Sequence, residues 1–209
     1  MPIEPGPREQ LERARLYLVV EAAAEPVVPA ALRGGMDMVQ LRDKRGDDDA
    51  ILRAAKRFGA LCRAHGALFW LNDRPDLAAR CGADGVHLGQ DDLPVAQARE
   101  LAPGLLVGVS THDPAQLEAA LEAGADQISV GPVWETPTKE GRPAAGLGYV
   151  THAARRAAGR PWFAIGGIDQ DNVDEVVAAG AERIVVVRAI RDARDPEAAA
   201  AALRAALPG

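Results

Sequence analysis

The sequence is poor in cysteine and aromatic residues and has no long apolar run. Its 209 residues include two cysteines, Cys62 and Cys81, and neither belongs to a C-x-x-C pair. This argues against a disulfide framework, and we expect both cysteines to be buried thiols. No stretch reaches the roughly 18 uninterrupted apolar residues of a membrane span. The first residues, MPIEPGP, lack the basic start and apolar run of a signal peptide, so we expect a cytoplasmic protein with no membrane partner.

Positive charge is also in short supply. The chain carries 24 Lys and Arg against 30 Asp and Glu, and only three of its basic residues are lysines, Lys44, Lys56 and Lys139. A protein whose main task is to neutralise nucleic-acid phosphates needs the opposite balance, so we expect no nucleic-acid partner. What the chain does have is 48% hydrophobic residues, enough for a sizeable core. No linker divides it, which predicts one domain over residues 1–209 with residues 1–7 flexible; the oligomeric state stays open.

Short β-branched runs alternate with helical segments along the whole chain, which is typical of parallel βαβ units. We expect strands at 16–20, 37–42, 68–72, 84–88, 105–110, 126–131, 162–166 and 183–187. Helical stretches fall at 47–65, 94–102, 113–123, 147–158, 169–179 and 195–206. Eight such strands predict an α/β fold, a single (β/α)8 TIM barrel. An open doubly wound sheet is the alternative.

A repeat supports the barrel. A glycine, a small or apolar residue and an acid precede a strand four times, at 35–37, 82–84, 124–126 and 180–182. The glycine supplies the left-handed conformation that ends a helix, and the next strand follows at once. These are alternate strands, as the pseudo-symmetry of a barrel predicts.

In a barrel of this kind, functional side chains come from the carboxyl ends of the strands. Gln40, Arg42 and Lys44 share one side of the second strand, while Val39 and Leu41 face the helices. An amide and two cations on the inward face predict an anionic ligand. The alternative is that Lys44 starts a solvated loop and Arg42 pairs with a neighbouring carboxylate.

Carboxylates follow the next two strands. Asp73 ends the third strand, and Asp91 and Asp92 follow the fourth. Asp73 with one of the latter two could hold Mg²⁺ beside substrate phosphate oxygens. Asp91 and Asp92 could instead cap the helix that begins near Pro94. His87, within the fourth strand, is expected to be a hydrogen-bonded core histidine.

Two further segments suit phosphate. The long loop at 134–148 carries hydroxyls at Thr136 and Thr138 and the rare Lys139, which is typical of a lid or binding loop. Gly166 and Gly167 precede a helix expected to begin at residue 169, and the loops after strands seven and eight are a common phosphate site of barrels.

Two anion sites on one barrel mouth fit a pair of phosphorylated substrates. The cationic site beside a metal predicts loss of diphosphate, with Mg²⁺ and lysines neutralising the charge of the leaving group. No residue is placed as a covalent nucleophile, since neither cysteine ends a strand and no G-x-S-x-G motif occurs.

The same residues resemble a known family. The motifs QLRDK (40–44), NDRPDLA (72–78), GADGVHLGQDD (82–92), GVSTH (108–112), GPVWETPTK (131–139) and AIGGI (164–168) are similar to those of thiamine phosphate synthases, in family order. The resemblance implies a transferase of thiamine biosynthesis. It joins 4-amino-2-methyl-5-hydroxymethylpyrimidine diphosphate to 4-methyl-5-(2-phosphoethyl)thiazole and releases diphosphate by a dissociative mechanism.

The resemblance also implies roles for individual residues. The pyrimidine diphosphate contacts correspond to Gln40, Arg42, Lys44, Asn72, Ser110 and Lys139, of which Arg42, Lys44, Ser110 and Lys139 are implied to be catalytic. The Mg²⁺ ligands correspond to Asp73 and Asp92. The thiazole phosphate contacts correspond to Thr136, Thr138, Gly167, Val187 and Arg188. At Arg188 the family usually has a small hydroxyl residue. Arginine can bind a phosphate through two donors, and the alternative is that Arg188 turns outward and the backbone N–H groups bind the phosphate.

Two other functions remain open at this point. A thiazole tautomerase resembles this fold but moves a proton, with His112 as the residue to examine. A non-catalytic barrel that binds a phosphorylated ligand is the second. The diphosphate cations and both metal aspartates occur together here, which favours the synthase, because neither alternative needs leaving-group stabilisers.

Overall fold

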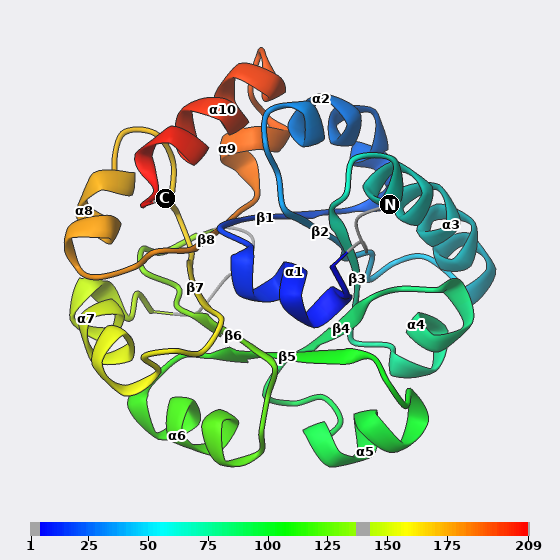
Figure 1. Ribbon diagram of the computed structural model, residues 1–209, viewed down its shortest axis with the longest axis horizontal. Helices are drawn as coiled ribbons and strands as arrows, with labels where there is room; N and C mark the ends of the chain where they lie inside the picture. The colour runs from blue at the N-terminus through cyan, green and yellow to red at the C-terminus, as the bar shows by residue number, and fades with distance from the viewer. Residues whose placement is uncertain (1–4, 137–142, 209) are drawn as a thin grey trace.

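The computed structural model describes residues 5–136 and 143–208. Its centre is a closed barrel of eight parallel strands in chain order, in which β8 pairs with β1 (Figure 1). The strands are β1 (Leu16–Val20), β2 (Met38–Leu41), β3 (Leu68–Asn72), β4 (Gly85–Leu88), β5 (Leu106–Thr111), β6 (Gln127–Val130), β7 (Trp162–Ile165) and β8 (Ile184–Val186). The predicted barrel is confirmed, and the open sheet is wrong.

Helices surround the strands. They are α1 (Pro7–Arg13), η1 (Ala22–Val27), α2 (Val28–Arg33), α3 (Asp48–Ala64), α4 (Pro75–Cys81), α5 (Val95–Leu101), α6 (Pro114–Glu122), α7 (Gly146–Arg156), α8 (Val173–Ala178), α9 (Arg188–Arg191) and α10 (Pro196–Ala206). Helix α8 begins later than expected, because Asn172 accepts a hydrogen bond from the Asp169 amide and donates one to the Gly167 carbonyl. These contacts hold residues 167–172 in a turn.

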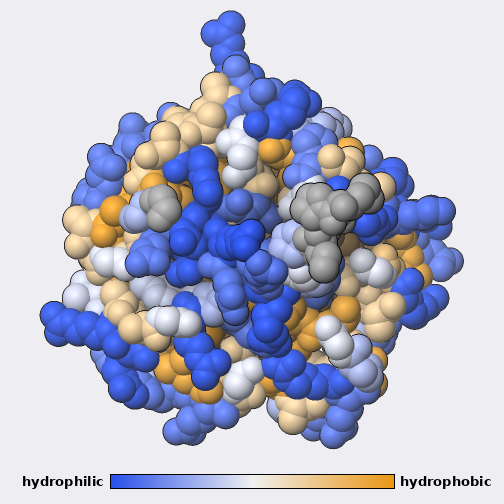
Figure 2. All heavy atoms as spheres, viewed as in Figure 1, coloured by the Kyte–Doolittle hydropathy of each residue, from blue (hydrophilic) through white to orange (hydrophobic). Residues whose placement is uncertain are grey.

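Helix α1 closes the amino-terminal end of the barrel. Its Leu11, with Ala14 after it, is buried with Tyr17, Trp70 and Phe163 inside the ring of strands. Figure 1 shows α1 lying across the middle of that ring, and the same view in spheres shows hydrophilic side chains gathered over the centre (Figure 2). Residues 1–7 were expected to be flexible. Pro7 belongs to α1, and residues 1–4 lie outside the described residues.

The repeated acids tie neighbouring strands together at this closed end. The Oδ2 atoms of Asp37, Asp84 and Asp126 accept hydrogen bonds from the amides of Leu16, Phe69 and Val107 at 2.9, 2.8 and 2.8 Å. Each acid precedes an even-numbered strand, and each amide belongs to the odd-numbered strand before it. All four repeat glycines have positive φ, as predicted. The repeat therefore has a structural role in setting the strand pairs.

The two cysteines differ in burial. Cys62 on α3 is fully buried, as expected, and burial raises its pKa to about 12. Cys81 is only partly buried, so the expectation of a buried thiol is wrong there, because the residue ends the short helix α4. Among the residues that the structure covers, no helix is long and apolar enough to cross a membrane.

Candidate active site

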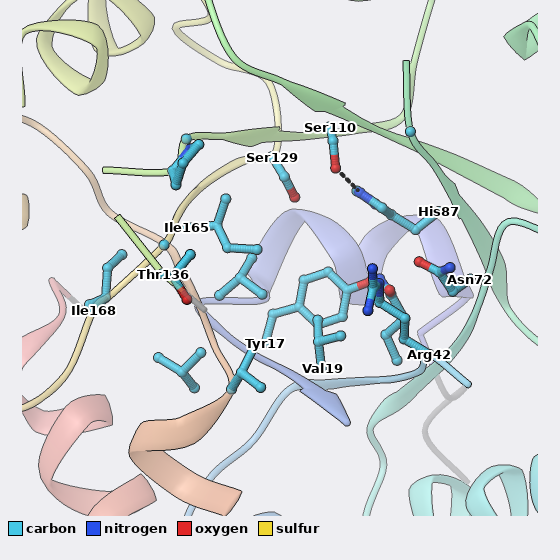
Figure 3. Close-up of a pocket in the computed structure, with 18 of the residues that line it drawn as sticks. Tyr17, Val19, Arg42, Asn72, His87, Ser110, Ser129, Thr136, Ile165 and Ile168 are labelled. Carbon is cyan, nitrogen blue, oxygen red and sulfur yellow. Dashed lines mark hydrogen bonds between the residues drawn. The ribbon is translucent and has the colours of Figure 1, made fainter. Parts of the chain in front are cut away.

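A cavity of about 630 Å³ opens at the carboxyl ends of the strands. Every predicted site residue that the structure describes lines it, namely Gln40, Arg42, Lys44, Asn72, Asp73, Asp92, Ser110, Thr136, Gly167, Val187 and Arg188. Figure 3 labels Arg42, Asn72, Ser110 and Thr136 among them. Thr138 and Lys139 lie outside the described residues, as does part of the predicted lid loop at 134–148. Residues from strands β2 to β8 and the loops after them thus meet at one mouth.

Arg42 brings an uncompensated positive charge to this pocket. Its side chain is half-buried, and within residues 5–136 and 143–208 it makes no side-chain hydrogen bond or ion pair. The alternative that Arg42 pairs with a neighbouring carboxylate is therefore wrong. Figure 3 shows Arg42 and Asn72 directed toward the same part of the cavity. A guanidinium partly removed from water without a counterion favours an anionic ligand.

The inward direction of Gln40 is confirmed, but it has a protein partner. Its Nε2 donates to the Tyr17 hydroxyl at 2.5 Å, while Val39 and Leu41 are buried in the outer core. Sequence reasoning missed Tyr17, which lines the pocket from β1. Burial raises the Tyr17 pKa far above its usual value, so the hydroxyl stays protonated. Alternation along β1 could have indicated Tyr17, because its side chain faces the barrel interior, as does that of Gln40 on β2.

Two carboxylates, those of Asp73 and Asp92, meet in the same cavity. Burial first, and then contact with Asp92, raises the pKa of Asp73, while Lys44 opposes the shift with its Nζ 3.5 Å from Asp73 Oδ2. Asp73 has a φ of 61°, the left-handed region that non-glycine residues seldom adopt. Asp92 accepts a hydrogen bond from the Gly89 amide at 2.6 Å. Held strain of this kind is common at functional sites.

The aspartates do not serve the helix that follows them. The residue before α5 is Pro94, and no side chain caps that helix, so the capping alternative for Asp91 and Asp92 is wrong. Two hard carboxylates in contact repel each other and fit a divalent cation that takes its remaining ligands from water and phosphate oxygens. In the described part of the chain no three metal-binding side chains cluster together. Asp73 and Asp92, which contact each other, are candidates for Mg²⁺.

A second candidate anion site lies after β7 and β8. Gly167 has a φ of 72°, and a Cβ there would lie 3.0 Å from the Trp134 Cβ, so the turn needs glycine. Helix α9 begins at Arg188, directly after β8, and no side chain caps it. The helix expected at residue 169 begins only at Val173, so the helix that starts at this site is α9 and not α8.

Arg188 is exposed at the edge of the cavity. Over the described ranges its guanidinium makes no side-chain hydrogen bond. Its planar fork of donors suits a phosphate.

His87 is a hydrogen-bonded core histidine, as predicted. It is 6% exposed, and its ring nitrogens contact Gln127 and Ser110. His112 also lines the pocket, with Nδ1 2.6 Å from the Gly131 carbonyl oxygen.

Comparison with known proteins gives one consistent answer. The family model described as thiamine monophosphate synthase matches residues 16–190. A thiamine-phosphate synthase from Thermus thermophilus is 57% identical over 203 residues, which cover 93% of this chain and 98% of the relative. One from Saccharopolyspora erythraea is 54% identical over 216 residues, covering 97% and 96%.

A solved structure agrees. Thiamine phosphate pyrophosphorylase from Pyrococcus furiosus superposes with a TM-score of 0.86 at 32% identity, covering 95% of this chain and 96% of that one. The resemblance in sequence and the likeness in fold thus extend over nearly the whole chain.

Proposed function

The chain belongs to the thiamine monophosphate synthase family, and from this premise we propose which of its residues carry each part of the reaction. The protein is a transferase that makes thiamine phosphate. Its substrates are 4-amino-2-methyl-5-hydroxymethylpyrimidine diphosphate and 4-methyl-5-(2-phosphoethyl)thiazole, and diphosphate leaves. We also infer that residues 1–209 act as one domain, which the unbroken run of βα units supports, and that this domain works in the cytoplasm, as expected of a biosynthetic enzyme of this family.

The diphosphate is bound by Arg42, Lys44 and Asn72, together with Lys139. The observation that carries this proposal is the half-buried Arg42 guanidinium that lacks a protein counterion in the described chain. Lys44 and Asn72 line the same pocket, and Lys139 is included on the sequence resemblance alone. Gln40 and Ser110 contact the same substrate. Cations placed where negative charge develops lower the barrier, because they bind the departing diphosphate more strongly than the intact ester.

Asp73 and Asp92 hold Mg²⁺. Their shared position in the pocket and the raised pKa of Asp73 support this assignment. When bound, the ion neutralises charge on the leaving diphosphate. Lys44 Nζ lies 3.5 Å from Asp73 Oδ2, so the proposed metal ligands and the proposed diphosphate-binding cations are in direct contact.

The thiazole phosphate is bound by Thr136, Gly167, Val187 and Arg188, with Thr138 added on the resemblance. The tight turn at Gly167 and the uncapped start of α9 support this. Arg188 replaces the small hydroxyl that the family usually has, and it can bind phosphate through two parallel N–H donors.

The reaction is dissociative. The bond between the pyrimidine methylene carbon and the diphosphate oxygen breaks first, and both electrons leave with the diphosphate. The methylene cation is stabilised by the ring's amino group, and the thiazole nitrogen then donates its lone pair to form the new C–N bond. No protein nucleophile is required, and neither Cys62 nor Cys81 lines the pocket.

The test combines purified protein, both substrates and Mg²⁺, and measures thiamine phosphate and diphosphate. We expect both products in equal amounts, and none with excess chelator. If neither product formed, the thiazole tautomerase and the non-catalytic barrel would become the better explanations. Full turnover in excess chelator would contradict the metal assignment.

A further inference from the structure

A row of buried polar side chains runs beneath Ser110 across three strands. Ser110 on β5 contacts His87 on β4, with Oγ 2.9 Å from Nε2 (Figure 3). His87 Nδ1 lies 3.0 Å from Gln127 Oε1, and Gln127 Nε2 donates to Ser129 Oγ at 3.0 Å on β6. All four side chains are between 0% and 6% exposed. The row thus links the floor of the cavity to the barrel interior.

The backbone makes room for this row. Gly108 on β5 lies beside the contact between His87 and Gln127, and a Cβ there would come within 2.5 Å of Gln127 Oε1 and 2.7 Å of His87 Nδ1. Any side chain at this position would push the two partners apart. The contact therefore depends on glycine at that point of the strand, and such a connected buried network fixes the direction of its groups.

The row fits one direction for its hydrogen bonds. Gln127 directs its oxygen to His87, and the neutral imidazole that suits this contact carries its proton on Nδ1. The other ring nitrogen, Nε2, then has a lone pair and accepts the Ser110 hydroxyl proton. With its proton directed to His87, Ser110 presents oxygen lone pairs to the cavity that it lines.

We propose that His87, held by Gln127, is a positioning residue that turns the lone pairs of Ser110 toward the organic half of the pyrimidine diphosphate. This role rests on the proposed function. Lone pairs repel phosphate oxygens, so the anionic half belongs to Arg42 and Lys44. They attract a group that becomes positive, and the pyrimidine methylene and amino groups do so as the diphosphate leaves. The contact therefore strengthens in the transition state.

The first test is a double-mutant cycle on kcat. Asn at position 87 keeps a polar group near Nδ1 but none near Nε2, whereas Gln reaches toward the place of Nε2. We expect His87→Asn to lower kcat roughly tenfold to hundredfold, the scale of a misplaced contact, with little change in KM. His87→Gln retains a higher kcat than His87→Asn. The double variant His87→Asn/Ser110→Ala is no slower than Ser110→Ala alone, because His87 acts through Ser110.

Losses that simply multiply in the double variant would overturn the role of His87. Should His87→Asn not fold, His87→Ala with Ser110→Ala gives the same cycle, because alanine also removes the contact with Ser110. Absence of product from the wild-type protein would overturn the proposed function and this role together, whereas wild-type turnover with independent losses would overturn this role alone.

The second test separates the two halves of the substrate. Binding of inorganic diphosphate with Mg²⁺ is measured by calorimetry for the wild type, Ser110→Ala and His87→Asn. We expect the same Kd for all three, since Ser110 faces the organic half. A weaker Kd for Ser110→Ala would mean that its hydroxyl donates to diphosphate, and would overturn the proposed direction.

Discussion

The two ends of the barrel differ in whether their charged side chains have partners in the protein. At the amino-terminal end, Asp126 is 5% exposed yet accepts hydrogen bonds from Arg8, Arg99 and the Val107 amide. At the mouth, Arg42 and Arg188 have no side-chain hydrogen bond within the described residues. The charge of Asp126 at the closed end is matched within the chain, whereas the guanidinium groups of Arg42 and Arg188 at the mouth are left for a ligand, although Lys44 there pairs with Asp73.

The difference separates stability from function. A carboxylate such as that of Asp126, whose oxygens are already hydrogen-bonded within the chain, stabilises the strand pair and has no reason to bind a ligand. The mouth holds Asp73 with positive φ and next to Asp92, both of which cost free energy in the absence of a ligand. Barrel enzymes in general keep catalysis at the carboxyl ends of the strands and stability at the other end. Substitutions at the two ends should therefore affect different measurements.

The largest effect is expected at the carboxylates. Asp73→Asn and Asp92→Asn each lower turnover by roughly two orders of magnitude or more, the scale for loss of one stabiliser of transition-state charge. Neither lowers the melting temperature of the ligand-free protein, because Asn tolerates positive φ and the repulsion is removed. Asp91→Asn is the matched control, since Asp91 lines the same cavity without contacting Asp73. Equal losses in all three variants would remove the distinction between Asp91 and Asp92.

Arg42→Gln comes next. Loss of charge-assisted hydrogen bonds to diphosphate is expected to lower kcat/KM by about tenfold to hundredfold, which corresponds to about 1.5–3 kcal/mol. Thermal unfolding stays as in the wild type, because no protein partner is lost. Steady-state kinetics with varied pyrimidine diphosphate checks this. A lower melting temperature with unchanged kinetics would show that Arg42 is structural.

At the closed end, Asp126→Ala is expected to destabilise without slowing turnover. It leaves the buried Val107 amide without its acceptor, which costs about 1–3 kcal/mol. For a chain of this size each kcal/mol lowers the melting temperature by about 2–4 °C. Glu182→Ala is the control, because this fourth repeat acid is 60% exposed and its side chain pairs with Arg183 at 3.4 Å. A lower kcat for Asp126→Ala at a temperature where the variant is folded would show that the closed end also contributes to catalysis.

The smallest effect is expected in the helical layer. The Arg156 guanidinium on α7 holds the pKa of Glu118 on α6 below its usual value. A lowered folded-state pKa adds stability that is present above the unfolded pKa and is lost as pH falls through the folded one. Arg156→Gln therefore lowers the melting temperature slightly at neutral pH, and the difference disappears in acid. If the difference in melting temperature between Arg156→Gln and the wild type persisted below the pKa of Glu118, it would come from packing of the Arg156 side chain and not from the ion pair. Turnover stays unchanged, unlike that of Arg42→Gln.

Strands and inward positions could be predicted because both leave periodic signals. Gln40 and Arg42 were placed in the pocket by alternation alone. The missed helices α1, η1, α2, α4 and α9 are all seven residues long or shorter, too short to show a clear helical period. The equally short α5 and α8 were predicted only as parts of longer stretches, at 94–102 and 169–179. Tyr17 was missed because it stands in an apolar run, and its polar role depends on Gln40 from another strand. Spacing could not decide between Asp91 and Asp92, since that choice depends on how the loop after β4 folds.

A crystal structure with Mg²⁺ and diphosphate would test the separation of the two ends most directly. We expect the metal at Asp73 and Asp92, diphosphate oxygens against Arg42 and Asn72, and an unchanged closed end. A metal bound by Asp91 without Asp73, or diphosphate seated only after β7 and β8, would contradict this expectation.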